Sequence, residues 1–198
     1  LVNRLRASHV VTGFDFVFGY KQEGNTQLLK NFSTKGNKFK CTVVEEFKKK
    51  ELNDFSSSQV RKFLFKGNLK KVKKILGRDW SVRARVIQGR KMGRKIGYPT
   101  ANLNIRKFCD ICFGVYEVSV LLKTNISESS FKGIANYGIK PTFKNPFPIL
   151  EIYIFDFNKD IYGESIEVVF KSFIRKEKKF SNIEELKKQI KKDIKFCK

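Results

Sequence analysis

The stretch Gly93–Leu103 combines the residue types that phosphate chemistry uses. Within it, Thr100 supplies a hydroxyl and Asn102 a carboxamide two residues further on. Because side chains at i and i+2 of a β-strand point the same way, this pair can share one hard ligand, such as a Mg²⁺ ion that carries nucleotide phosphates. The glycines Gly93 and Gly97 allow backbone N–H groups to approach those phosphates. An ordinary turn followed by a strand explains the stretch equally well, so the rest of the chain has to decide.

A second polar set lies in the later, strand-rich part of the chain. Asn136 is placed between glycines, and Glu151 interrupts the apolar run Ile149–Phe155. Alternation places Glu151 on the same side as Ile149 and Tyr153. If the carboxylate lines a cavity, desolvation raises its pKa and suits it to general-base work. The alternative is an exposed cross-strand partner for a lysine, which is the commoner role of an isolated glutamate.

Three further places hold candidate site residues, and two of them have the residue types of an anion site. Arg175, followed by Glu177, lies between the last strand and the terminal helix, where it can reach a phosphate, stack on an aromatic ligand or cap the helix. In the first segment, Asp15 and Phe16 belong to a glycine-punctuated loop after a strand. Hydroxyls and an arginine at a helix start form an anion site or a plain N-cap, and this pattern comprises Ser57, Ser58 and Arg61.

The elements that would position these residues fall into two classes. Period-2 runs over 82–87, 115–121, 149–157 and 166–173, separated by turn residues, predict an antiparallel barrel or sandwich. An amphipathic helix closes the chain, with Ser181 and Glu184 as its capping box.

The segment before the β-rich part predicts an α/β fragment. It has a buried strand over His9–Thr12, a helix over Asn25–Phe32 capped by Asn25, and a strand over Phe39–Phe47. Residues 56–77 predict two short helices, the first capped by Ser57 or Ser58 and the second capped by Asn68 and ended by Gly77. The chain starts with Leu and almost at once enters a strand, so we expect a further piece of the natural protein upstream.

Composition excludes several classes of function. The 198 residues carry a net charge of +23, but the lysines are spread along the whole chain, so we interpret them as solvated faces and do not expect nucleic acid as a partner. No apolar run has the length of a membrane span and the basic opening segment lacks the apolar h-region of a signal peptide, so we expect a cytoplasmic protein without a membrane partner. With one histidine in the chain, the CxxC pair Cys109 and Cys112 lacks further zinc ligands, and we expect ordinary reduced thiols.

Taken in order, these pieces resemble the prokaryotic bifunctional riboflavin kinase/FAD synthetase (FMN adenylyltransferase) family. Residues from about 78 onward resemble the complete riboflavin kinase module. Several spaced blocks in one order make this resemblance specific, whereas the Pro-Thr-Ala-Asn element alone would not. The matching blocks are Gly97–Leu103, Gly114–Tyr116, Gly133–Phe143, Glu151, Asp156–Gly163 and Arg175–Phe180.

The resemblance implies a six-stranded antiparallel barrel with a C-terminal helix, which transfers the ATP γ-phosphoryl group to the 5′-hydroxyl of riboflavin to give FMN. Thr100 and Asn102 would bind Mg²⁺ and the phosphates, and Glu151 would accept the proton. Arg175 and its neighbour Glu177 would close on the flavin, and Asn136 would also bind it. The basic loop that would fold over the nucleotide comprises Gly89, Gly93, Arg94 and Gly97.

Residues 1–62 resemble the second half of a nucleotidyltransferase-like, Rossmann-type FMN adenylyltransferase module. The matching residues are Asp15, Phe16, Ser57, Ser58 and Arg61. Ser58 stands where the family usually has Thr, and the family's paired-His nucleotide motif is missing. We therefore expect FAD formation only from the intact chain.

The resemblance predicts three parts: 1–62 from the adenylyltransferase, a helical connector over 63–78, and the riboflavin kinase domain over 79–198. Two alternatives stay open. One is a basic β-barrel that binds RNA or another polyanion, supported only by the charge. The other is a flavin binder whose kinase is degenerate, suggested by a loop before Gly93 that is less glycine-rich than is common in the family.

Overall fold

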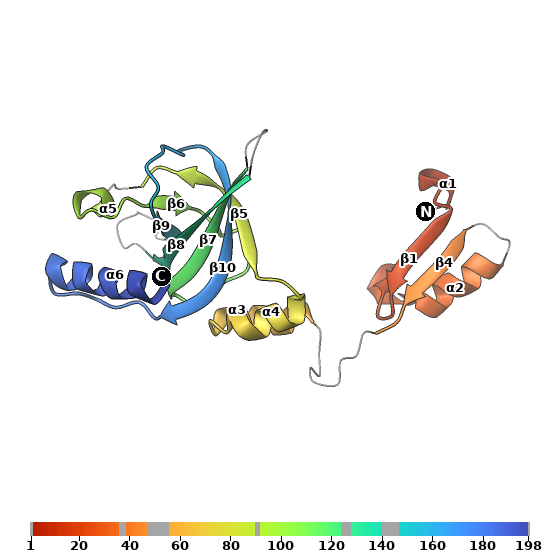
Figure 1. Cartoon of the computed structure of the whole chain (residues 1–198). Coiled ribbons are helices and arrows are strands. Elements are labelled where there is room, and N and C mark those ends of the chain that lie inside the picture. The colour runs from red at the N-terminus through yellow and green to blue at the C-terminus, as the bar shows by residue number, and fades with distance from the viewer. Residues whose placement is uncertain are drawn as a thin grey trace. The chain divides into compact units, whose positions relative to one another are not determined.

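The computed structural model describes residues 2–35, 39–46, 56–89, 92–123, 128–139 and 147–197. The chain divides into two compact units, Leu1–Phe55 and Ser56–Lys198 (Figure 1). Parts of several sequence predictions, namely Phe47, Arg90, Lys91 and the Pro141–Phe143 end of one block, lie outside the described residues. Among the described residues, no helix is long and apolar enough to cross a membrane.

The first unit is a small α/β arrangement, as the sequence predicts. Strands β1 (His9–Gly13) and β4 (Lys40–Val44) pair in parallel, with α2 (Thr26–Thr34) between them in the chain. The Asn25 carboxamide caps α2, because its Oδ1 accepts a hydrogen bond from Leu28 N at 2.9 Å. The smaller elements are α1 (Val2–Leu5), β2 (Val17–Phe18), a 3₁₀ turn at Tyr20–Gln22 and β3 (Gly24–Asn25).

Strand β1 is not buried, contrary to the sequence prediction. Only Thr12 is buried among its residues, and Val11 is 60% exposed. The described part of this unit offers a single parallel pair of strands and one main helix, so little surface is available to cover both faces of the strand. The β-branched, apolar composition of this segment therefore predicted the strand correctly, but the prediction that the strand is buried was wrong.

The second unit contains a closed six-stranded antiparallel barrel with strand order β10-β5-β6-β9-β8-β7, which confirms the expected fold class. Strands β5, β7, β9 and β10 match the four period-2 runs, although β9 ends before the predicted 157 because a turn follows Ile154. The bounds are β5 Ser81–Ile87, β6 Ala101–Leu103, β7 Gly114–Lys123, β8 Glu128–Ile139, β9 Pro148–Ile154 and β10 Ser165–Arg175.

Alternation along each strand separates the inside of the barrel from its outside. On β9, Leu150, Ile152 and Ile154 belong to the main core cluster, so they point inward. Glu151 and Tyr153 therefore project outward, on the side that the sequence alternation predicted. Core side chains fill the middle of the barrel, and Glu151 lies on the outer face of the wall.

The helices α3 (Ser57–Phe65) and α4 (Leu69–Leu76) pack against this barrel rather than linking it loosely. Leu64, Leu69 and Val72 join the main core cluster. Asn68 caps α4 and Gly77 ends it in the left-handed region with φ of 71°, both as predicted. The cap of α3 is Ser56, whose Oγ accepts from Gln59 N at 3.2 Å, so the predicted cap at Ser57 or Ser58 lies inside the first turn instead.

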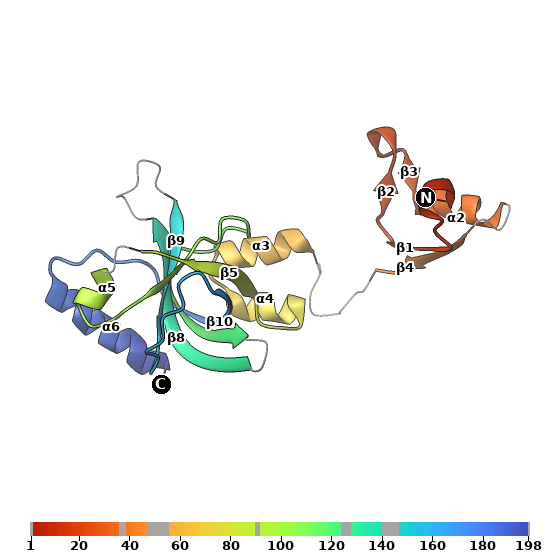
Figure 2. The same cartoon turned by 90° about the horizontal axis from the view of Figure 1, so that it is seen from above.

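The terminal helix α6 (Ile183–Cys197) covers the outer faces of β7 and β8 and lies on a different side of the barrel from α3 and α4 (Figures 1 and 2). Ile190 and Ile194 pack there against Val115 and Ile134. The expected capping box is shifted by one residue. Asn182 Oδ1 accepts from Glu185 N at 2.9 Å, and Glu185 Oε2 accepts from Ser181 N, so Glu184 takes no part in those two bonds.

Candidate functional site

Three of the predicted site residues lie side by side on the outer wall of the barrel. Glu151 on β9 is directly opposite Asn102 on β6 and directly opposite Asn136 on β8. Directly opposed residues of neighbouring strands project to the same face, and the strands are about 4.8 Å apart. The row Asn102–Glu151–Asn136 therefore presents a carboxylate between two carboxamides over roughly 10 Å.

The loop after β5 touches one end of this row. A Cβ on Gly89 would collide with the Asn102 carboxamide, so only a residue without a side chain fits there. Asn102 is 7% exposed and its Nδ2 donates to the Thr100 carbonyl at 3.4 Å. A carboxamide oxygen is a hard donor of the kind that Mg²⁺ prefers.

The same loop also reaches Thr100. A Cβ on Gly93 would lie 3.4 Å from Thr100 Oγ1 and would overlap the Tyr98 carbonyl. Gly93 lies in the short helix α5 (Met92–Lys95). Gly97 follows this helix with φ of 89°, a conformation that favours glycine. Gly89 thus lies against Asn102 and Gly93 against Thr100, whereas a Cβ on Gly97 would meet open space.

A cavity of about 470 Å³ adjoins this motif, and its lining explains what it can hold. Arg94 and Lys159 supply positive charge, and Phe157 and Tyr162 supply aromatic surface. Thr100 is also in the lining, while Asn102 faces outward beside it. Cations with aromatic rings suit a ligand that combines phosphates with a planar base. The other lining residues are Val86, Pro99, Ala101, Ile152, Ile154, Asn158, Asp160 and Ile161.

At the other end of the row, Asn136 meets Glu177. Asn136 Nδ2 donates to Glu177 Oε1 at 3.3 Å. Gly138, two residues along β8 on the same face, contacts the Glu177 carboxylate so closely that a Cβ would overlap it. The segment after β10 therefore lies directly over the outer face of β8.

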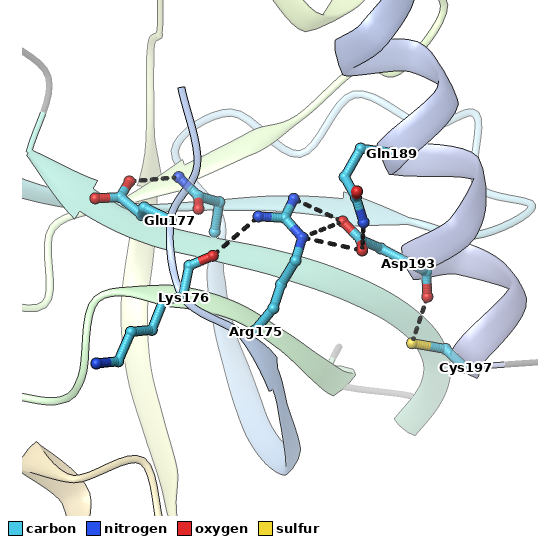
Figure 3. Close-up of polar contacts among 7 residues, drawn as sticks. Arg175, Lys176, Glu177, Gln189, Asp193 and Cys197 are labelled. Atoms are coloured by element: carbon cyan, nitrogen blue, oxygen red, sulfur yellow. Dashed lines mark hydrogen bonds and ion pairs between the residues drawn. The ribbon is translucent and has the colours of Figure 1, made fainter. Parts of the chain in front are cut away.

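Arg175 is brought near this end but is already engaged by protein groups. Its Nε and Nη2 donate to the Asp193 carboxylate at 2.7–3.0 Å, and its Nη1 donates to the Lys176 carbonyl (Figure 3). The guanidinium also lies 5.9 Å from the centre of the Phe180 ring. Of the roles the sequence left open, contact with the terminal helix is the one the structure shows.

The sequence prediction missed Asp193, although a signal for it was present. The apolar stripe of the terminal helix runs through Ile183, Leu186, Ile190 and Ile194. Asp193 follows Ile190 by three positions and Leu186 by seven, so a helix puts it on the same face. A carboxylate within an apolar stripe requires a buried partner, and Arg175 is that partner.

The predicted adenylyltransferase residues are distributed over both compact units. In the first, Asp15 is exposed and the Phe16 ring stacks on Phe18 with centroids 5.7 Å apart. In the second, Arg61 Nη2 donates to Ser58 Oγ at 3.4 Å in the first turn of α3, beside Ser57. Ser58 and Arg61 are therefore together at a helix start.

The described residues contain no cluster of three His, Cys, Asp or Glu side chains that could hold a metal. The four cysteines are free, and burial raises the pKa of Cys109 and raises that of Cys197 to about 11, so both remain protonated thiols at neutral pH. Burial also raises the pKa of Tyr116 and Tyr137 inside the barrel, which keeps those phenols neutral.

Two family models match separate parts of the chain. A model described as riboflavin kinase covers residues 76–198, and one described as FAD synthetase covers residues 1–59. The chain belongs to the riboflavin kinase family. The resemblance to the bifunctional riboflavin kinase/FAD synthetases, which rested on sequence blocks alone, is thereby confirmed.

Curated relatives agree with both models. The chain is 40% identical over its full length to a bifunctional riboflavin kinase/FMN adenylyltransferase of Buchnera aphidicola from Schizaphis graminum, of which it covers 63%. The corresponding Haemophilus influenzae protein is 36% identical over the full chain, also with 63% of that protein covered. That of Escherichia coli K12 is 36% identical over 98% of the chain and 60% of that protein. The chain thus spans about three fifths of the length of these relatives.

A solved structure supports the architecture. A crystal structure described as a macrolide-efflux protein from Streptococcus pneumoniae superimposes with a TM-score of 0.78 at 32% identity. The match covers 96% of this chain and 60% of that one. The likeness therefore extends over both compact units of the chain.

Proposed function

We propose that residues 79–198 catalyse transfer of the γ-phosphoryl group of ATP to the 5′-hydroxyl of riboflavin, giving FMN and ADP. The observation that carries this proposal is the row Asn102–Glu151–Asn136 beside a cavity lined by Arg94 and Thr100. Phosphoryl transfer requires positioning and charge neutralisation rather than covalent chemistry by the protein. A base, a cationic pocket and a loop that folds over the phosphates are sufficient parts.

In this proposal Glu151 is the general base. Its carboxylate accepts the proton of the riboflavin 5′-hydroxyl as that oxygen bonds to the γ-phosphorus and the bond to the ADP oxygen breaks. The central place of Glu151 in the row, with Asn102 on one side and Asn136 on the other, supports this role. The carboxamide on the Asn102 side lies toward the nucleotide, and that on the Asn136 side lies toward the flavin.

ATP would occupy the cavity beside Thr100. Phe157 and Tyr162 offer surfaces for the adenine, and Arg94 and Lys159 offer charge for the phosphates. The glycines Gly89, Gly93 and Gly97 let the loop backbone approach them. The volume of about 470 Å³ falls within the usual range for a small-molecule site.

The residues fit a magnesium ion only together with the nucleotide. The Thr100 hydroxyl and the Asn102 carboxamide oxygen are hard oxygen donors, and Mg²⁺ is commonly held by one or two such groups plus substrate phosphates. Bound there, the ion would neutralise charge on the transferring phosphoryl group.

Riboflavin would lie on the outer wall beside the segment Arg175–Glu177, which covers the wall at Asn136. Glu177 is held at that wall by Asn136 and by the close approach to Gly138. We propose that Arg175 contributes through the position of this segment, since its guanidinium nitrogens are bonded to Asp193 and Lys176.

We propose that residues 1–62 belong to an FMN adenylyltransferase module and that 63–78 connects it to the kinase domain. Asp15, Phe16, Ser57, Ser58 and Arg61 would serve FMN adenylylation to FAD in the intact protein. The match of residues 1–59 to the FAD synthetase model supports this assignment. We further propose that the chain acts in the cytoplasm on riboflavin, ATP and FMN.

The test is to incubate the chain with riboflavin and MgATP and to separate the flavins by chromatography. We expect FMN without FAD. In Glu151→Gln we expect turnover to fall by about 10²–10⁴ with riboflavin binding retained. The matched control is Glu128→Gln, which removes an exposed barrel carboxylate that pairs with Lys123.

Other outcomes would replace the proposal. Riboflavin binding without FMN would indicate a flavin binder with a degenerate kinase. Neither binding nor turnover, together with affinity for RNA that falls steeply with salt, would indicate a polyanion-binding barrel. Unchanged turnover in Glu151→Gln would reject the assigned base.

A further inference from the structure

The segment that leaves β10 is fixed at its first residue by the terminal helix. Figure 3 shows the Arg175 guanidinium facing the Asp193 carboxylate of α6. Both Asp193 oxygens accept from Arg175 Nε at 3.0 Å, and Oδ2 also accepts from Nη2 at 2.7 Å. Such a fork-shaped contact specifies orientation as well as distance.

The Asp193 side chain is almost completely shielded from solvent. It is 3% exposed, and the side chain of Arg175 is 17% exposed. Gln189, one turn earlier on α6, donates its Nε2 to Asp193 Oδ1 at 2.8 Å. Removing one partner of a buried charge pair leaves the other charge uncompensated, so α6 and Arg175 cannot separate without a large penalty.

The other end of the segment is fixed by the barrel wall. Glu177 accepts from Asn136 Nδ2 and lies against Gly138 on β8. Asn136 is directly opposite Glu151 and also directly opposite Val115, which in turn is directly opposite Arg175. The outer-face row thus continues from the proposed base, across β8 and β7, to the arginine that α6 holds.

We propose that Asp193 is a positioning residue for the riboflavin site, acting through Arg175 to fix the segment Arg175–Glu177 over the outer wall of β8. This inference rests on the proposed function. In this arrangement α6 orients the flavin side of the site and does not affect the nucleotide side, because no residue of α6 lines the cavity that contains Arg94 and Thr100.

The test compares Asp193→Asn with the matched control Glu184→Gln, which neutralises a carboxylate of the same helix that is 84% exposed. Asparagine keeps the shape of Asp193 but removes the charge and turns a donor toward the guanidinium. We expect the KM for riboflavin, and the Kd from quenching of riboflavin fluorescence, to rise about tenfold. The KM for MgATP should stay within about twofold, and Glu184→Gln should match the unmodified chain.

A merely structural role would give a different pattern. Loss of thermal stability with an unchanged riboflavin KM, or an equal rise in both KM values, would overturn the proposal. If Asp193→Asn does not fold, as judged by circular dichroism, Gln189→Ala takes its place because it removes one hydrogen bond to the carboxylate and leaves the charge pair. There we expect a rise of about two- to threefold in the riboflavin KM, and no rise would overturn the proposal.

Failure of the kinase assignment would be recognised separately. If the unmodified chain binds riboflavin but forms no FMN, the proposed function fails, and the riboflavin Kd of Asp193→Asn still decides the positioning role. An unmodified chain that neither binds riboflavin nor forms FMN would overturn both.

Discussion

Single residues on the outer wall of the barrel carry the proposed chemistry, and their contacts make separate tests possible. Thr100 is the simplest case, because it lines the cavity while its backbone carbonyl accepts a hydrogen bond from Asn102. A substitution that changes only the hydroxyl therefore leaves the Asn102 contact in place.

We expect Thr100→Val to raise the Mg²⁺ concentration needed for half-maximal turnover by about tenfold, since the methyl group that replaces the hydroxyl is no ligand. Thr100→Ser should restore it to within about twofold. The measurement is a titration of turnover with magnesium at saturating riboflavin. An identical magnesium dependence in Thr100→Val would show that the hydroxyl is not a ligand.

The contact between Gly89 and Asn102 gives a second residue-level prediction. A methyl group at position 89 has to displace the Asn102 carboxamide, so Gly89→Ala should lower kcat/KM for MgATP by about tenfold. The neighbouring exposed residue offers the control Gln88→Ala, which should have no effect. Steady-state kinetics with riboflavin held at saturation would check both, and equal rates would mean that Asn102 tolerates displacement.

At the level of elements, the helix pair α3–α4 is tied to the barrel by charge as well as by its apolar face. Asp79, just after α4, accepts from Lys171 of β10 at 2.8 Å and pairs with Lys73 of α4 at 3.0 Å. The hydrogen bond from Lys171, with Lys73 beside it, lowers the pKa of Asp79 below its ordinary value of 3.8. The ionised carboxylate therefore stabilises the folded state.

The sign of the pH effect follows from that direction. A lowered folded-state pKa contributes stability that is present above the unfolded value and is lost as the pH falls through the folded value. We expect Asp79→Asn to lower the free energy of unfolding by about 0.5–1 kcal/mol at pH 7, with the difference shrinking below about pH 4. Urea unfolding at several pH values measures it, and a difference that grows toward low pH would contradict the assignment.

Much of the barrel was predictable because four strands obey strict alternation and their turns are rich in glycine and asparagine. Strand β8 was missed because its glycines interrupt the pattern. At Gly133 a Cβ would lie 2.6 Å from the Tyr153 carbonyl, and at Gly138 it would overlap Glu177. Gly133 allows a close approach to the neighbouring strand, and Gly138 allows a close contact with the segment after β10. From periodicity alone, both glycines were interpreted as turn signals.

The site was predictable to the extent that its residues share a strand or a short motif. Glu151 and its facing direction followed from alternation along one strand. The approach of Asn102, Glu151 and Asn136 depends on register between three strands, which no local pattern encodes. The partner of Arg175 lies 18 residues away on a helix, so its identity needed the packed structure.

For the molecule as a whole, the net charge of +23 should act on substrates according to their own charge. MgATP is anionic and riboflavin is neutral, so a strongly basic chain raises the encounter rate of only one of them. We expect kcat/KM for MgATP to fall several-fold between low and physiological salt, while the Kd for riboflavin stays constant. Equal salt dependence for both substrates would show that charge has no steering role.

The two-sided character of β9 has a consequence for redesign. Its inward residues Leu150, Ile152 and Ile154 hold the barrel together, whereas Glu151 and Tyr153 look outward from the same short strand. Core packing residues and the proposed general base therefore occupy alternate positions of one short strand. Variation at Tyr153 would leave the inward packing intact, whereas variation at Ile152 or Ile154 would change the packing of the barrel and the lining of the proposed nucleotide cavity together.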